Sequence, residues 1–205
     1  MLVERDVAQL SDDQFSPTYL RNATAYGASS RLRLDVVLND FVAAAVTTGG
    51  IYIKSDGTPW RPIVRIRDII AAIIAVLEAP KEAVHNQTFN VGLTAENYRI
   101  SELAEIVRQV VPGSRVEYAP DGGPDKRCYR VSCEKIRRVL PNFRPQWNAR
   151  RGALELYEAY RTVGLTDERR GTYIRMNQIQ RLLKSGQIDA SLQWSRKTAE
   201  AAIVA

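Results

Sequence analysis

The sequence predicts an α/β fold with too few strands for a complete doubly wound sheet. Predicted strands and helices alternate along the chain. The strands show alternating or short apolar patterns, and in the helices apolar residues recur at helical spacing. Glycine and proline separate these segments, which is typical of an α/β chain. The 205 residues suffice for one compact domain or for two small lobes.

The predicted helices follow from apolar stripes. Residues 2–10 place their apolar side chains on one helical face, and no capping residue precedes them. A second stripe runs from Asp35 to Val46 and ends at Gly49, and a third begins at Asp68, the predicted N-cap, and stops at Pro80. Further helices are predicted over residues 101–110, 132–140, 149–160 and 173–184.

The predicted strands are short and widely spaced. They cover residues 18–23, 51–53, 61–67, 88–92 and 115–118. Residues 18–23, around Leu20, are predicted to form a short buried strand. Arg65 and Arg67 alternate with Val64 and Ile66, so we expect both arginines on the exposed face of an edge strand.

Composition excludes several classes of protein. No apolar run approaches the roughly 18 residues needed to cross a bilayer, and the charged start lacks a signal core, so we expect a cytoplasmic protein without a membrane partner. His85 is the only histidine, and Cys128 and Cys133 are five residues apart. This spacing predicts neither a metal site nor a redox pair, and any general base would have to be a carboxylate, tyrosine or lysine.

The net charge of +6 allows either nucleic acid or a phosphorylated small molecule as a partner. The arginines are scattered, and no run of five or six basic residues exists, so we do not expect binding to nucleic acid. We expect a solvated basic surface at Arg137, Arg138, Arg169 and Arg170.

Four segments together resemble one enzyme family, the extended short-chain dehydrogenases/reductases that act as NAD-dependent epimerases and dehydratases on nucleotide sugars. The first is similar to a strand and loop of the family, and the second to its hairpin and helix start. The third is similar to a later strand, and the fourth to a loop and helix. They are residues 20–27 (LRNATAYG), 56–68 (DGTPWRPIVRIRD), 89–92 (FNVG) and 125–136 (DKRCYRVSCEKI).

The resemblance covers about residues 1–165, and residues 166–205 are predicted to be a helical C-terminal extension. It implies a partial Rossmann-type sheet edge plus the small C-terminal substrate-binding α/β lobe of an extended short-chain dehydrogenase/reductase. It also implies a nucleoside-diphosphate sugar as the ligand.

The resemblance assigns candidate ligand contacts. Arg61 is the first candidate for the diphosphate, because a guanidinium fork suits phosphate oxygens and because its neighbours Trp60 and Pro62 would fix its backbone. Arg127 is the second candidate, with a mobile loop charge as the alternative. Tyr129 is a candidate to pack on the ligand or to hydrogen-bond to it, with a half-buried strand tyrosine as the alternative.

Two more substrate contacts and a cofactor contact follow from the resemblance. Thr24 stands where many relatives have a substrate-binding asparagine. Asn39 is a candidate for a sugar or phosphate contact, with a solvent-facing position as the alternative. Asn22 and Ala23 stand where the family backbone touches the nicotinamide end of NAD.

The sequence lacks both parts that carry the family's chemistry. It contains no G-x-x-G-x-x-G loop for the cofactor pyrophosphate and no Tyr-x-x-x-Lys pair. The nearest pattern, Tyr157 with Arg161, ends in arginine, which cannot lose its proton, so we assign no catalytic residue.

We therefore expect a truncated family member, cut just after the expected lysine, that neither binds NAD nor turns over substrate alone. The alternative is a non-catalytic sugar-nucleotide-binding module. Because a buried parallel strand and helix would lose their partners, we expect the chain to dimerise, to pair with a separate N-terminal half, or to be marginally stable.

Overall fold

The computed structural model describes residues 2–123 and 127–195, and it confirms the α/β class. Asp125 and Lys126 of the fourth segment, and the last ten residues of the extension, lie outside the described residues. The helices are α1 (Leu2–Ala8), α2 (Val37–Thr48), α3 (Ile66–Leu77), α4 (Lys81–Val84), α5 (Ile100–Val110), α6 (Glu134–Val139), α7 (Ala149–Thr162), α8 (Asp167–Thr172) and α9 (Arg175–Lys184). The strands are β1 (Thr18–Asn22), β2 (Thr24–Tyr26), β3 (Gly50–Ile53), β4 (Trp60–Arg65), β5 (Gln87–Val91), β6 (Asn97–Arg99) and β7 (Arg115–Tyr118).

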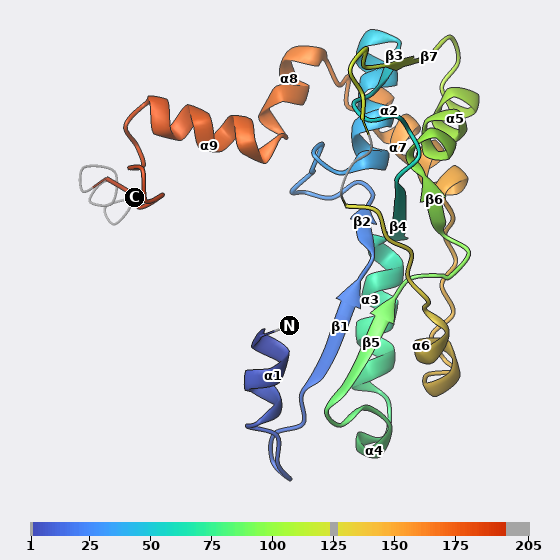
Figure 1. Ribbon diagram of the computed structural model, residues 1–205, viewed down its shortest axis with the longest axis vertical. Helices are drawn as coiled ribbons and strands as arrows, with labels where there is room; N and C mark the ends of the chain where they lie inside the picture. The colour runs from blue at the N-terminus through green and yellow to red at the C-terminus, as the bar shows by residue number, and fades with distance from the viewer. Residues whose placement is uncertain (1, 124–126, 196–205) are drawn as a thin grey trace.

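The strands form small separate sheets (Figure 1). β1 pairs with β5 in parallel, and β3 pairs with β7 in parallel. β4 lies between β2, to which it is parallel, and β6, to which it is antiparallel. β3 therefore does not pair with β4, although the two strands follow each other along the chain. Ile51 and Ile53 of β3 are buried in a core shared with α2 and α5.

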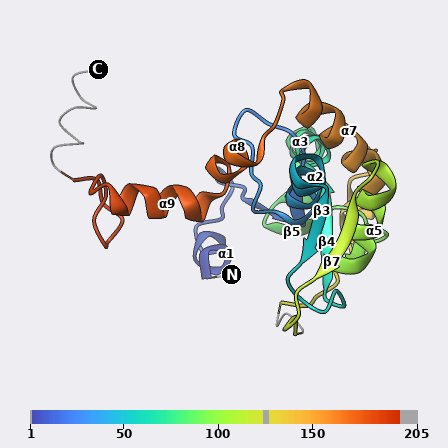
Figure 2. The same ribbon diagram turned by 90° about the horizontal axis from the view of Figure 1, so that it is seen from above.

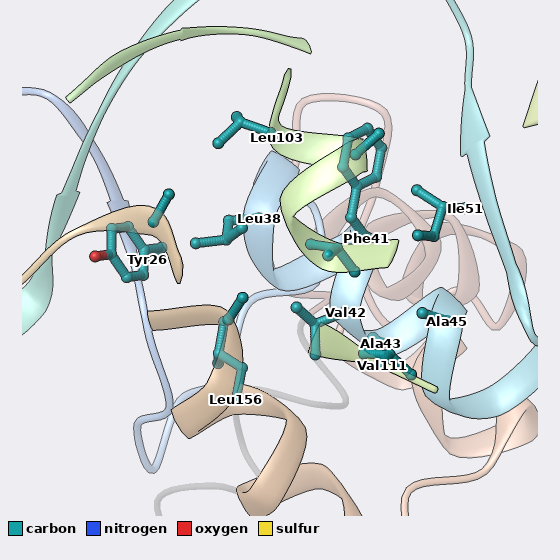
Figure 3. Close-up of a cluster of buried hydrophobic side chains, with 14 of the residues drawn as sticks. Tyr26, Leu38, Phe41, Val42, Ala43, Ala45, Ile51, Leu103, Val111 and Leu156 are labelled. Carbon is teal, nitrogen blue, oxygen red and sulfur yellow. The ribbon is translucent and has the colours of Figure 1, made fainter. Parts of the chain in front are cut away.

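Two hydrophobic cores lie on either side of β4. Ile63 enters the first core, which gathers α2, β3, α5 and α7, and whose members include Leu38, Phe41, Ile51 and Leu156 (Figure 3). Val64, the next residue, enters the second core beneath α3, β5 and α6. Because successive side chains of a strand point to opposite faces, β4 joins the two lobes.

The segment after α7 first packs against the first lobe and then projects away from it. Figures 1 and 2 show α8 beside α2 and α9 projecting outward, on the side opposite α5. Among the described residues, no helix is long and apolar enough to cross a bilayer.

Two predictions at the end of β4 are wrong. Arg65 is 2% exposed on a central strand, not on the face of an edge strand, and Arg67 lies in the first turn of α3. Asp68 does not cap α3, because the helix begins at Ile66. Its buried carboxylate instead accepts hydrogen bonds from the backbone N–H groups of Gln146 and Trp147, at 3.0 and 3.2 Å.

A buried polar frame holds α7 against β4. The Arg65 guanidinium forms two hydrogen bonds with the Glu155 carboxylate, at 2.6 and 2.8 Å. The Glu96 carboxylate accepts from Tyr98 Oη at 3.0 Å and from the Ala149 N–H at 2.8 Å, and burial raises its pKa. These contacts fix the sheet that carries one wall of the candidate site.

The second lobe exposes an apolar face. Ile70, Ile73, Ile74 and Leu77 recur at helical spacing on α3 and are 43–78% exposed. Nearby, β1 pairs only with β5 in the described part of the chain, and its residues are half-buried or exposed, not buried as predicted. This lobe therefore has both an open sheet edge and an apolar surface.

Gly152 makes room for Tyr26, and we expect Gly152→Ala to destabilise the protein. Alanine normally favours a helix over glycine by up to about 1 kcal/mol. Here the new Cβ would lie 2.1 Å from Tyr26 Cε2, and the Tyr26 ring is buried and tied through Oη to the Asn148 carbonyl at 3.0 Å. Overpacking costs about 1–3 kcal/mol, so the melting temperature should fall.

Gly171→Ala on α8 is the matched control. Its new Cβ would meet only Asn177 Nδ2, at 3.9 Å, so the melting temperature should stay or rise. A fall in the control as large as that of Gly152→Ala would contradict the steric explanation.

Candidate functional site

A cavity of about 930 Å³ lies between α2, β3, β4 and the segment that follows β7. α2 lies here because its apolar face, from Leu38 to Ala45, packs into the first core. The left-handed Gly49, at φ 72°, ends the helix and turns the chain directly into β3. One short connection therefore positions two of the cavity's walls.

Four of the five predicted substrate contacts line this cavity. Thr24 begins β2, Arg61 is the second residue of β4, and Arg127 and Tyr129 follow β7. They come from three of the four sequence segments and lie up to 105 positions apart along the chain (from 24 to 129). The fold thus brings together residues that belong to separate motifs.

Arg61 is held on a rigid strand. It lies opposite Tyr98 in the β4–β6 ladder, and its Nη1 donates to the Trp60 carbonyl at 2.8 Å. The Trp60 ring is itself covered by the guanidinium groups of Arg99 and Arg130, at 5.4 and 4.6 Å from the ring centroid. These contacts support the expectation that the neighbours of Arg61 fix its position.

The segment of Arg127 and Tyr129 is attached to the same strand. The Trp60 N–H donates to the Cys128 sulfur at 3.4 Å, between the two predicted contacts. Arg127 is exposed, and Tyr129 is 49% exposed, so both side chains remain accessible to a ligand in the cavity.

Asn39 lies apart from the other predicted substrate contacts. It is buried, its Oδ1 accepts from the Gly27 N–H at 2.9 Å, and its Nδ2 donates to the Arg33 carbonyl at 2.9 Å. It is not among the residues that line the cavity. In this arrangement its side chain holds the loop that leads into α2.

Asn22 and Ala23 stand at the junction of the two lobes. Asn22 ends β1 and is exposed, and the Ala23 N–H donates to the Val91 carbonyl at 3.0 Å. In parallel sheets, ligands commonly bind outside the carboxyl ends of the strands, which is where both residues lie.

The cavity mixes cations and carboxylates. Lys54, Arg61, Arg127 and Arg170 line it together with Asp35, Asp40 and Glu117. Two of these carboxylates already have arginine partners: Arg33 forms a bidentate pair with Asp35 and holds its pKa below the usual range, and Arg170 pairs with Asp40 at 2.7 Å. Because Arg33 adds its positive charge from outside the lining, cations outnumber carboxylates at this cavity, and this excess favours an anion.

Sequence reasoning missed several lining residues. Tyr52 and Lys54 lie on and just after β3 and match no motif. The expectation of a solvated surface is wrong for Arg170, whose side chain is 22% exposed and ion-paired with Asp40. Only the chain's path from α7 back to α2 brings this arginine to the cavity, so local sequence held no signal.

A second hollow, of about 630 Å³, borders β6 and α5. Its walls include Trp60, Asn97, Tyr98 and Glu102, but none of the predicted site residues. Because Arg99 and Arg130 cover the Trp60 ring, this hollow offers less free aromatic surface to a ligand.

The Tyr157–Arg161 pair lies on α7, outside the cavity lining. The Arg161 guanidinium is 5.5 Å from the centroid of the Tyr157 ring, which packs against the first core. Its position agrees with a structural role for this pair.

Comparison with known proteins bears on the origin of this arrangement. Residues 1–92 match the NAD dependent epimerase/dehydratase family. The match contains the first three of the four segments, and the predicted family resemblance is confirmed. The fourth segment lies beyond the matched residues.

Solved structures of epimerase/dehydratase type share the fold. An epimerase from Methanothermobacter thermautotrophicus matches with a TM-score of 0.67 and 18% identity, over 78% of this chain and 48% of that chain. UDP-glucuronic acid 4-epimerase from Bacillus cereus, solved with UDP-glucuronic acid and NAD, matches with a TM-score of 0.64 and 17% identity, over 78% and 50%. dTDP-glucose 4,6-dehydratase from Bacillus anthracis, solved with NAD, matches with a TM-score of 0.58 and 19% identity, over 70% and 44%.

The chain thus spans about half the length of these solved structures. At such identities, the likeness shows the fold. The mixed α/β fold with small parallel sheets, predicted from the sequence, matches part of the fold of these structures.

Proposed function

We propose that this chain supplies the sugar-nucleotide-binding part of an NAD-dependent epimerase or dehydratase. The observation that carries the proposal is the gathering of Thr24, Arg61, Arg127 and Tyr129 around one cavity. Guanidinium groups offer several N–H donors to phosphate oxygens, and a hydroxyl can both donate to and accept from a sugar. The B. cereus epimerase, which shares the fold, was solved with a ligand of this class.

In this proposal the chain's residues bind and orient, while NAD chemistry needs further parts. NAD takes up and returns a hydride when it is bound. By the family resemblance, Asn22 and Ala23 would border its nicotinamide end, and their place at the carboxyl end of β1 supports this. The 205 residues contain no glycine-rich pyrophosphate loop and no Tyr-x-x-x-Lys pair that could hold NAD or move a proton.

A second candidate is a non-catalytic sugar-nucleotide-binding module. The exposed apolar face of α3 and the open edge of β1 favour a protein partner for either candidate. That partner would be a cofactor-binding half or a second copy of this chain. The two candidate functions differ in whether the assembled protein chemically converts its ligand or only binds it.

We expect the 205-residue chain to bind a nucleoside-diphosphate sugar without turning it over. Calorimetry with UDP-, GDP-, CDP- and dTDP-sugars measures the binding, and NADH absorbance with product analysis measures turnover. NAD-dependent turnover by this chain alone would contradict the proposal. So would the absence of binding to any of the four classes of sugar nucleotide.

Complementation separates the two candidates. A first-half fragment of a related epimerase, carrying the glycine loop and the Tyr-x-x-x-Lys pair, is added to the bound chain. A gain of turnover supports the enzyme, and unchanged binding without turnover supports the module.

A further inference from the structure

The C-terminal extension forms one wall of the candidate site. Arg170 of α8 and Ile174, just before α9, line the same cavity as Arg61 and Arg127. Two contacts hold this segment in place: the Leu34 N–H donates to the Tyr173 carbonyl at 3.2 Å, and Arg170 Nη2 lies 2.7 Å from Asp40 Oδ1. Figure 1 shows α8 beside α2, which carries Asp40.

The Arg170 guanidinium keeps hydrogen-bonding capacity in this position. Its bond to Asp40 uses Nη2, and Nη1 reaches Asp167 only at 3.5 Å. Nε is buried and has no hydrogen-bond partner among the described residues. Since a guanidinium carries five N–H donors, the group can accept an anion in addition to, or in place of, Asp40.

We propose that Arg170 is a ligand-binding residue that contacts an anionic oxygen of the bound sugar nucleotide. Asp40 is its partner in the free protein, so the ligand's anion competes with the Asp40 carboxylate for the same cation. The inference rests on the proposed function, because it concerns the same cavity. It gives the extension a direct part in ligand recognition.

Two substitutions that both break the Arg170–Asp40 pair should change affinity in opposite directions. Arg170→Gln removes the cation, so we expect dissociation constants about tenfold higher, equivalent to about 1.4 kcal/mol. Asp40→Asn removes the competitor and keeps the cation, so we expect unchanged or tighter binding. If the pair served only to dock the extension, both variants would weaken binding alike.

The experiment is calorimetry on the full chain with the tightest of the UDP-, GDP-, CDP- and dTDP-sugars. Arg169→Gln is the matched control, because Arg169 is an exposed neighbour that is not among the cavity's lining residues. Arg170→Lys keeps the charge and should recover part of the affinity. Thermal melting of each variant verifies that it is folded.

The ligand series locates the anion. If Arg170 contacts phosphate, Arg170→Gln weakens the binding of a nucleoside diphosphate that carries no sugar. If it contacts a sugar carboxylate, the substitution weakens only the binding of a nucleoside-diphosphate uronic acid. Wild-type affinity in Arg170→Gln would overturn this inference but not the proposed function. The same holds if Asp40→Asn or Arg169→Gln lowers the affinity as much as Arg170→Gln does. Absence of all binding by the wild-type chain would overturn the proposed function with it.

Discussion

Arg61→Glu is expected to abolish the binding of nucleoside-diphosphate sugars. The change places a carboxylate where the site would hold phosphate oxygens, on a paired strand that fixes the direction in which the side chain leaves the backbone. Replacing attraction by repulsion at a partly buried contact should raise the dissociation constant at least a hundredfold, about 2.7 kcal/mol. Calorimetry with the tightest-binding sugar nucleotide measures the change.

Arg138→Glu controls for the altered net charge. Arg138 is exposed on α6 and is not among the residues that line the cavity. Its reversal changes the protein charge by the same amount and should leave affinity within about twofold, because salt screens exposed charges. Unchanged affinity in Arg61→Glu would remove Arg61 from the site, and equal losses in both variants would indicate a non-specific electrostatic effect.

Glu155→Ala is expected to cause the largest loss of stability. Arg65 is 2% exposed and forms two hydrogen bonds with Glu155, whose side chain is 24% exposed; the Asp68 carboxylate is a second negative charge that interacts with Arg65 but forms no hydrogen bond with it in the described part of the chain. Removing one partner of such a pair leaves the buried charge without its hydrogen-bonded carboxylate and costs about 3 kcal/mol. Arg65 has no easy retreat, because its guanidinium packs against Gly27 and lies 5.1 Å from the centroid of the Trp147 ring.

Urea denaturation measures this loss as a lower midpoint at an unchanged slope. Glu158→Ala is the control, because Glu158 is exposed one turn further along α7. Arg65→Met with Glu155→Leu should recover most of the stability, because the double variant leaves no unpaired charge. Equal midpoints for Glu155→Ala and Glu158→Ala would contradict the role of the pair.

Local patterns predicted the elements better than their surroundings. The helical stripe before Gly49 and the strand at residues 115–118 were found close to their observed bounds, because each depends on nearby residues. The exposure of Arg65 was wrong for a different reason. Alternation with Val64 and Ile66 is typical of a strand, but a helix 90 positions later supplies the carboxylate that allows burial.

The candidate site shows the same division. Thr24, Arg61, Arg127 and Tyr129 could be selected because motifs place them, although their assembly depends on pairing between distant strands. Arg170 could not be selected, since only the return of the chain to α2 brings it to the cavity. The predicted role of Asp68 as an N-cap is wrong. A carboxylate near a helix start can accept hydrogen bonds from backbone N–H groups of a remote loop as well as from those of its own helix.

The placement of Ile63 and Val64 in different cores limits how this protein can be divided. The first core contains buried residues from the ranges 26–63, 103–111 and 149–165. The second core contains buried residues from the ranges 64–91 and 133–143. No single cut therefore yields two independent modules. Exchanging one lobe with a relative to alter specificity would require grafting several separated segments at once.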